Sequence, residues 1–223
     1  MTGQQLLNLD AEAAAGLLRR QDELQTEARQ IVRDLKLVSL LERAGPVSQH
    51  GSALSGLMAW PDLDFGITSP GLDPAGAFEI LHPLLTHPST TMVRYTNETG
   101  SHTFANDPRN ERLFFMVSYE HESGRLWKID IPFWLHSEPR QERQFHLQLM
   151  DRLTPDARLA VLWLKDLWHS TPLYPAPVGS VDIYTAVLDH NVRSPAEFDA
   201  YLRAREKPTL AEAESVRVKA RDL

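Results

Sequence analysis

The 223-residue sequence contains no cysteine. A disulfide framework, a thiolate zinc site, an iron–sulfur cluster and a cysteine nucleophile are therefore excluded. The sequence also lacks any apolar run of the ~18 to 20 residues that a membrane-spanning helix needs. Its first eighteen residues contain two acidic residues and no Lys or Arg, whereas a signal peptide begins with basic and then apolar residues. We therefore expect a cytoplasmic protein with no membrane partner.

Basic residues are in the minority, with 23 Lys and Arg against 30 Asp and Glu, and the formal net charge is −7. Because phosphate backbones attract clustered Lys and Arg, a broad nucleic-acid-binding surface is not expected. Hydrophobic residues make up 42% of the chain, which is typical of a folded globular protein and excludes disorder for most of it. This length suits one large domain or two small ones.

Several familiar site motifs are also absent. There is no Gly-x-Gly-x-x-Gly after a strand, no Walker-type Gly-Lys-Ser/Thr and no Gly-x-Ser-x-Gly elbow. The nine His residues form no i, i+2 or i, i+4 pair, so a histidine metal site is not expected. We interpret His50 as structural and the five Trp residues as part of the core.

Hydrophobic periodicity predicts the order of the secondary-structure elements. The first twenty residues are expected to be a frayed or weakly helical lead-in, and residues 206–223 a peripheral helix or a mobile tail. Helices are predicted at residues 22–43, 53–58, 74–85, 139–152, 155–169, 180–188 and 194–205, and strands at residues 47–50, 63–67, 91–95, 112–119 and 126–135.

The order of these elements changes near Ser137, from mixed strands and helices to helices alone. This order predicts an α+β or α/β domain followed by a small helical domain. We place the first domain, with its N-terminal helix, at residues 1–136 and the helical one at residues 137–223. The helical domain is expected to form one wall of the substrate pocket.

The most informative segment places two carboxylates on one strand. Residues two apart in a strand share a face, so Asp62 and Asp64 project together while Leu63 and Phe65 point to the other side. Two carboxylates this close repel each other unless a positive charge lies between them. A hard divalent cation such as Mg²⁺, which prefers oxygen ligands, removes that repulsion.

Two further features point to phosphate chemistry. Gly51 and Ser52 lie where a strand turns into a helix, and glycine allows close backbone approach to a phosphate at a helix N-terminus. In the apolar segment 127–133, Lys128 and Asp130 share the polar face. If this strand neighbours the one with Asp62 and Asp64, the three carboxylates converge and can hold two cations for phosphoryl or nucleotidyl transfer.

The arrangement of Gly51-Ser52, nine intervening residues, Asp62-x-Asp64 and a later Asp130 in an apolar strand resembles the nucleotidyltransferase superfamily with the DNA polymerase β type of palm. In layout it is most similar to the small bacterial members that modify antibiotics. The resemblance covers roughly residues 47–133 and implies an α+β palm, a mixed sheet with flanking helices, followed by a C-terminal helical bundle. Trp60 and Pro61 depart from the pattern, because they make the segment directly before Asp62 bulky and stiff.

The resemblance also implies roles for individual residues. Gly51 and Ser52 would bind the nucleoside triphosphate, and Asp62 and Asp64 would bind Mg²⁺ or Mn²⁺. Asp130 would complete the metal site or take the proton of the acceptor. Lys128 is either a phosphate-binding residue or a solvated strand residue.

The resemblance implies an enzyme that transfers AMP from ATP, or another nucleotide, to a hydroxyl of a small acceptor and releases pyrophosphate. An aminoglycoside-like antibiotic is one such acceptor, which would make the protein a resistance enzyme. Two alternatives stay open: nucleotidylation of tRNA or of a partner protein in a toxin–antitoxin pair, and a non-catalytic nucleotide-binding module. A homodimer is also compatible with the sequence.

Overall fold

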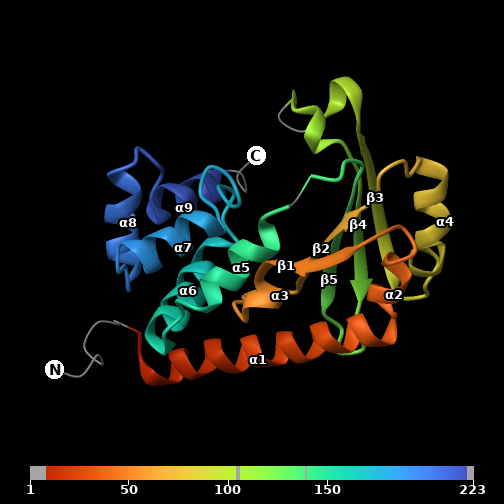
Figure 1. Ribbon diagram of the computed structural model, residues 1–223. Helices are drawn as coiled ribbons and strands as arrows, with labels where there is room; N and C mark the ends of the chain where they lie inside the picture. Colours follow the sequence, from red (N-terminus) through yellow and green to blue (C-terminus); the bar gives the residue numbers. More distant parts are fainter. Residues whose placement is uncertain (1–8, 104–105, 139, 220–223) are drawn as a thin grey trace. The chain divides into compact units, whose positions relative to one another are not determined.

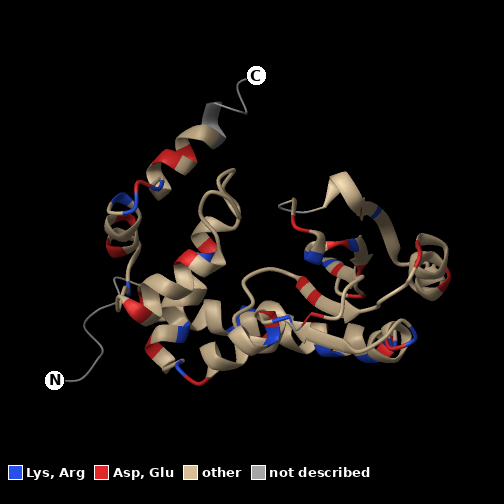
Figure 2. Cartoon of the chain, turned by 45° about the horizontal axis from the view of Figure 1, so that its top comes forward, with Lys and Arg blue, Asp and Glu red and all other residues tan. Residues whose placement is uncertain are grey.

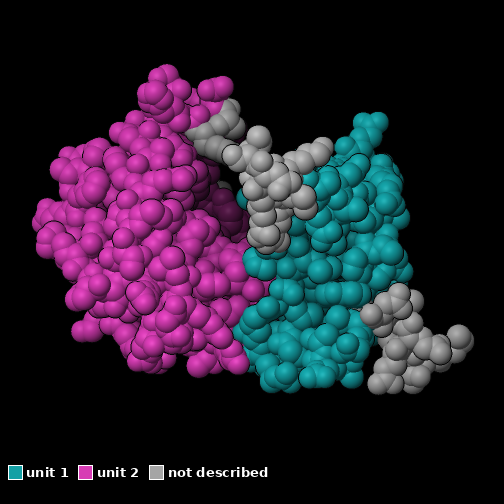
Figure 3. All heavy atoms as spheres, turned by 180° about the vertical axis from the view of Figure 1, so that it is seen from behind, with its two compact units in different colours: residues 1–22, 149–223 teal, residues 23–148 magenta. Residues whose placement is uncertain are grey.

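Figure 1 shows the computed structural model of the protein, which describes residues 9–103, 106–138 and 140–219. The chain divides into two compact units, coloured in Figure 3. Residues 23–148 form the first, which we call the strand unit. The segments before residue 23 and after residue 148 form the second, the helical unit. The predicted boundary near Ser137 falls within the strand unit, and the assignment of two domains stays a prediction.

The strand unit contains one five-stranded sheet with the strand order β1-β2-β5-β4-β3 (Figure 1). β2 and β5 run parallel, and the other neighbours run antiparallel. This mixed sheet with flanking helices confirms the predicted α+β class. The strands are β1 (Val47–His50), β2 (Asp62–Thr68), β3 (Thr90–Glu98), β4 (Arg112–Glu120) and β5 (Leu126–Trp134).

One face of the sheet is packed against helices. Alternate residues of β2 and β5, such as Phe65 and Ile131, are fully buried and belong to the same hydrophobic core as Leu24 of α1 (Ala11–Asp34) and Leu81 of α4 (Pro74–Leu85). Each such side chain contributes about 1.5 to 3 kcal/mol on burial. Period-2 alternation therefore sends every second residue of β2 and β5, including the carboxylates, to the opposite face.

The N-terminal helix differs from the sequence prediction. α1 begins at Ala11 rather than at Asp22, so the predicted weak lead-in is wrong for residues 11–20, while residues 1–8 lie outside the described residues. An Ala-rich start with high helix propensity and a buried Leu17 explain the longer helix. The helix also ends earlier than predicted, at Asp34, because Lys36 adopts a left-handed conformation with φ of 49° before α2 (Leu37–Leu41).

The remaining predicted elements are all present, although α3 (Gly51–Ser55) begins two residues before the predicted helix at 53–58 and ends three residues before it does, and β3 extends beyond the predicted strand at 91–95. The 3₁₀ turns are Gly100–His102 and Pro108–Asn110. Residues 220–223 of the predicted tail, and Pro139, lie outside the described residues. Within the described part of the chain, no helix is both long and apolar enough to span a membrane. The later helices are α5 (Glu142–Met150), α6 (Pro155–Trp168), α7 (Ser180–Asp189), α8 (Pro195–Arg203) and α9 (Leu210–Lys219).

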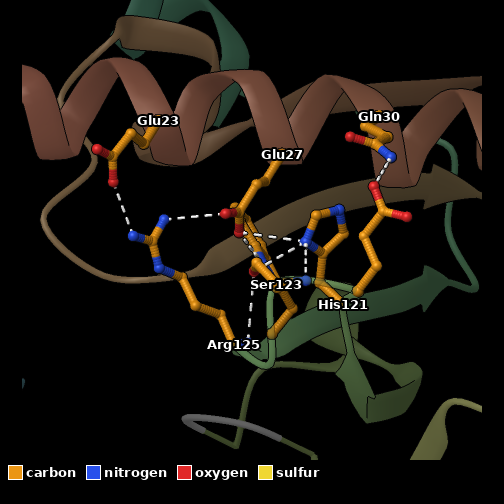
Figure 4. A network of polar contacts seen from close by, with 8 residues as sticks. Glu23, Glu27, Gln30, His121, Ser123 and Arg125 are labelled. Carbon is orange, nitrogen blue, oxygen red and sulfur yellow. Dashed lines mark hydrogen bonds and ion pairs between the residues drawn. The ribbon is translucent and has the colours of Figure 1, made fainter.

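A polar network ties α1 to the turn between β4 and β5 (Figure 4). Arg125 forms ion pairs with Glu23 at 2.7 Å and with Glu27 at 3.0 Å. The second carboxylate oxygen of Glu27 accepts a hydrogen bond from Trp127 Nε1 at 3.1 Å and lies 3.6 Å from His121 Nδ1. The Glu27 side chain is only 13% exposed, so it anchors the start of β5 to α1.

We expect Glu27→Ala to lower the free energy of unfolding by about 2 to 4 kcal/mol, because it leaves the buried Trp127 indole N–H without its partner and removes the less exposed of the two carboxylates that bind Arg125. The matched control is Glu23→Ala, which removes the same type of side chain from the same arginine. Glu23 is 57% exposed, so its loss should cost less than ~1 kcal/mol. Urea denaturation measures both variants, and equal losses would show that the network does not anchor β5.

Candidate active site

Three carboxylates meet on the face of the sheet opposite to the core. The register of the parallel pair places Asp64 beside Asp130 and Asp62 beside Lys128. Asp62, Asp64 and Asp130 each offer one carboxylate oxygen, and these oxygens lie within 4.8 Å of one another. The prediction that the two strands are neighbours is therefore confirmed, and their side chains form one cluster.

Lys128 lies between two of the carboxylates. Its Nζ is 2.9 Å from Asp130 Oδ2 and 3.3 Å from Asp62 Oδ1. Burial by itself would lower the pKa of Lys128, but the charges of Asp62 and Asp130 outweigh it and raise the pKa above its ordinary value. The ammonium therefore stays charged and offsets the repulsion between the carboxylates. Lys128 is part of the cluster rather than a freely solvated strand residue.

Asp62 is the most buried of the three aspartates. Burial raises its pKa, while the charge of Lys128 acts in the opposite direction. Oδ1 of Asp130 is buried and accepts no hydrogen bond, and Oδ1 of Asp62 is buried and makes the 3.3 Å ion pair with Lys128 but no hydrogen bond. Buried carboxylate oxygens that lack a donor are costly unless another positive group binds them. Together with the all-oxygen donor set, they fit a hard divalent cation such as Mg²⁺ or Mn²⁺.

The backbone of Gly51 lies directly against the carboxylate of Asp64. It begins α3 with φ of +71°, and a Cβ at this position would lie 1.9 Å from Asp64 Oδ2. Only glycine therefore allows the backbone to approach the Asp64 carboxylate this closely. The neighbouring Ser52 is buried, and its carbonyl accepts a hydrogen bond from the Leu57 amide at 3.0 Å. The roles of Gly51 and Ser52 toward a phosphate stay predictions.

Sequence reasoning missed two residues beside the aspartates. Trp60, which we interpreted as core, is only partly buried, and its Nε1 donates a hydrogen bond to Asp62 Oδ2 at 3.3 Å. His50 is the register partner of Asp64, and its buried Nδ1 makes no hydrogen bond. Burial lowers the pKa of His50. Their nearness to Asp62 and Gly51 in the sequence was the available signal.

We expect Gly51→Ala to destabilise the protein by more than the conformational cost of an alanine at positive φ, which is about 1 to 2 kcal/mol. Gly56→Ala is the matched control, because Gly56 has a similar φ of +67° and no atom within 4 Å of an added Cβ. The difference between the two variants in chemical denaturation measures the clash with Asp64. Equal losses would contradict the close packing of Gly51 against this carboxylate.

Lys128→Met removes the positive charge between Asp62 and Asp130. We expect it to lower the free energy of unfolding by about 1 kcal/mol without divalent cations, since the ion pairs are partly exposed. Saturating Mg²⁺ should then raise the melting temperature more in this variant than in the wild type, because no ammonium competes for the carboxylates. The control is Arg94→Met, an exposed residue of β3. An equal Mg²⁺ effect in all three proteins would contradict a cation site here.

No family model matches the sequence, and no curated protein does either. Solved structures do match. The Cid1 poly(U) polymerase bound to MgGTP aligns with a TM-score of 0.54 and 16% identity, over 80% of this chain and 55% of that chain. Cid1 described as an RNA terminal uridylyl transferase aligns with a TM-score of 0.54 and 16% identity, over 82% and 53%. This chain thus spans about half the length of the structures it matches. It has the fold of the nucleotidyltransferase superfamily with the DNA polymerase β type of palm.

Proposed function

We propose that the protein is a metal-dependent nucleotidyltransferase that moves a nucleoside monophosphate from a nucleoside triphosphate to a hydroxyl group. The observation that carries this proposal is the convergence of Asp62, Asp64 and Asp130, whose carboxylate oxygens lie within 4.8 Å of one another on the sheet face opposite to the core. A chain that kept only the fold would not need three charged residues at so costly a spacing. This argues against the non-catalytic alternative.

Asp62, Asp64 and Asp130 would hold Mg²⁺ or Mn²⁺, which activates the acceptor hydroxyl and neutralises charge on the triphosphate when bound. Lys128 adds a fixed positive charge at the Asp62 end of the cluster, where it would stabilise the triphosphate and the departing pyrophosphate. The backbone at Gly51 and Ser52, which follow the Asp64 partner His50 along the chain, would bind the phosphates on the Asp62 side of Asp64. Trp60 positions Asp62 through its hydrogen bond.

The proposed reaction is a single in-line displacement. The acceptor oxygen forms a bond to the α-phosphorus, and the bond from that phosphorus to the oxygen bridging to the β-phosphate breaks. Pyrophosphate leaves with the bonding electron pair. The carboxylate of Asp130 takes the proton of the acceptor hydroxyl. The chain contributes mainly position and charge, as is usual for phosphoryl transfer.

ATP is the proposed donor, with transfer of AMP. The structures that share the fold include Cid1 complexes with MgGTP and with a UTP analogue, so the fold itself does not restrict the base. All four nucleoside triphosphates therefore belong in the assay.

Two acceptors are proposed for the test. A small hydroxylated compound such as an aminoglycoside follows from the sequence pattern and would suit an acidic protein. An RNA 3′ end is favoured by the match to an RNA terminal uridylyl transferase. Lys and Arg are interspersed with Asp and Glu along the chain (Figure 2), so the RNA version relies on local contacts at the terminus rather than on a long basic track.

We expect Asp64→Asn to reduce transfer at least about a thousandfold, because the acidic cluster loses one of its charges. The folded protein should be as stable as the wild type or slightly more stable, since repulsion falls. Asp34→Asn, an exposed substitution at the end of α1, is the control. The assay follows label from each α-labelled nucleoside triphosphate onto kanamycin, a short oligoribonucleotide, tRNA and protein in a cell extract.

The same assay tests the cation. EDTA should abolish transfer, Mg²⁺ or Mn²⁺ should restore it, and Zn²⁺ should not, because the donor set is all oxygen. Transfer by folded Asp64→Asn at the wild-type rate would refute the role given to this residue. Reactivation by Zn²⁺ alone would refute the choice of metal.

A further inference from the structure

A small cavity lies on the same sheet face as the three carboxylates. It is lined by Ser48 and His50 of β1, Gly66 and Thr68 of β2, Trp134 at the end of β5, and Arg140. Its volume is about 170 Å³. Pockets for drug-sized ligands measure roughly 300 to 1,000 Å³. This cavity therefore takes one small ring rather than a whole extended ligand.

The register relates the cavity directly to the carboxylates. Gly66 follows Asp64 by two residues on the same face of β2, which places it about 7 Å further along the strand. On the neighbouring β1, His50 pairs with Asp64 and Ser48 pairs with Gly66. The cavity therefore begins at His50, the register partner of Asp64, and extends along β2 away from Asp62.

Arg140 is held in a fixed position at this cavity. Its guanidinium lies 3.7 Å from the centre of the Trp134 ring, and it donates hydrogen bonds to Asn110 Oδ1 at 3.0 Å and to the Arg109 carbonyl. Its remaining polar atom, Nε, is buried and makes no hydrogen bond. A rigid guanidinium with one unused N–H is prepared for a single acceptor atom.

His50 adds a second unused polar atom to the same cavity. Its Nδ1 is buried and makes no hydrogen bond. A buried polar atom without a partner is costly. Two such atoms, on two residues that line one cavity, indicate an occupant that offers hydrogen-bonding groups. The hydroxyls of Ser48 and Thr68, and the exposed carboxylate of Glu142, add further partners around it.

The in-line geometry of the proposed displacement indicates which of the two substrates would lie in the cavity. The residues proposed to bind the triphosphate, Ser52 and Lys128, lie toward the Asp62 end of the cluster, because Ser52 follows His50 along the chain and Lys128 pairs with Asp62. Pyrophosphate would leave toward that end. In an in-line displacement the attacking oxygen enters from the opposite side. The cavity beyond Asp64 lies on that opposite side.

We propose that this cavity is the acceptor subsite of the transferase and binds a hydroxylated sugar ring. The inference rests on the proposed function and adds the residues that would bind the acceptor. Arg140 Nε–H donates to one ring oxygen, and His50 Nδ1 exchanges a hydrogen bond with a second hydroxyl. A further hydroxyl of the same ring then attacks the α-phosphorus, its proton passes to Asp130, and pyrophosphate departs. The ring is either the terminal ribose of an RNA or a sugar of a small glycoside.

The test uses the full chain with Arg140→Gln, and with Arg143→Gln as the matched control. Arg143 is exposed and does not line the cavity. A second variant, Ser48→Val, adds bulk to the cavity without removing a charge. Binding of a Mg²⁺–nucleoside triphosphate is measured first for each protein, by calorimetry. Binding and transfer are then measured with a short oligoribonucleotide in one arm and kanamycin in the other.

In the arm whose probe is the acceptor, Arg140→Gln should raise the acceptor KM about 10- to 100-fold, the factor that a lost hydrogen bond to a charged group carries. Ser48→Val should also raise the acceptor KM, because its added bulk fills the cavity. The nucleotide KM should stay within about twofold of the wild type, and Arg143→Gln should change neither value. The arm that responds identifies the source of the sugar.

Two results would overturn the subsite. One is an unchanged acceptor KM in folded Arg140→Gln and Ser48→Val. The other is wild-type protein that binds Mg²⁺–nucleotide but neither probe, which would leave the proposed nucleotide chemistry intact while removing the sugar subsite. Failure to bind any Mg²⁺–nucleotide would instead refute the proposed function itself.

Discussion

The repulsion among Asp62, Asp64 and Asp130 is the constraint on which the site depends. Carboxylate oxygens from these residues lie within 4.8 Å of one another on a sheet whose other face carries the hydrophobic core. Charges this close destabilise the folded chain unless they are balanced. Lys128 supplies part of the balance through contacts of 2.9 Å with Asp130 and 3.3 Å with Asp62. The other oxygen of Asp130, Oδ1, is buried and has no donor, which suits a divalent cation.

The rest of the strand unit holds these charges in place. β2 and β5 can lie side by side and parallel only because the chain returns through β3 and β4, and the hydrophobic core fixes the register through Phe65, Ile129 and Ile131. A slip of one residue would bury the carboxylates and expose the core. At the start of β5, Glu27 of α1 binds Arg125 and Trp127 and anchors the strand that carries Lys128 and Asp130.

The same sheet face explains why the carboxylates and the proposed acceptor subsite are neighbours. Polar residues alternate with core residues along β1 and β2, so His50 and Ser48 follow the carboxylates in register. Arg140 extends the polar surface from outside the sheet, because the Trp134 ring and the carbonyl of Arg109 hold its guanidinium. The proposed reaction centre and the ring-sized cavity therefore lie on one face of the sheet, as transfer between two substrates would require.

The sequence determined the main features of the fold and the core of the site. Strict alternation in residues 62–67 and 127–133 placed Asp62, Asp64, Lys128 and Asp130 on polar faces, and the turn at Gly51-Ser52 located the start of a short helix. These features are local, since period and turn chemistry act within a few residues.

Which strands are neighbours, and what surrounds the carboxylates, depend on the tertiary structure. The sequence allowed β2 and β5 to pair but did not fix that pairing, because it depends on burial of non-local apolar surface. The hydrogen bond from Trp60 to Asp62, the packing of Gly51 against Asp64 and the cavity at Arg140 all depend on that pairing. The longer α1 was missed for the same reason, because its added turns are stabilised by an Ala-rich start and a buried Leu17 rather than by a strong apolar stripe.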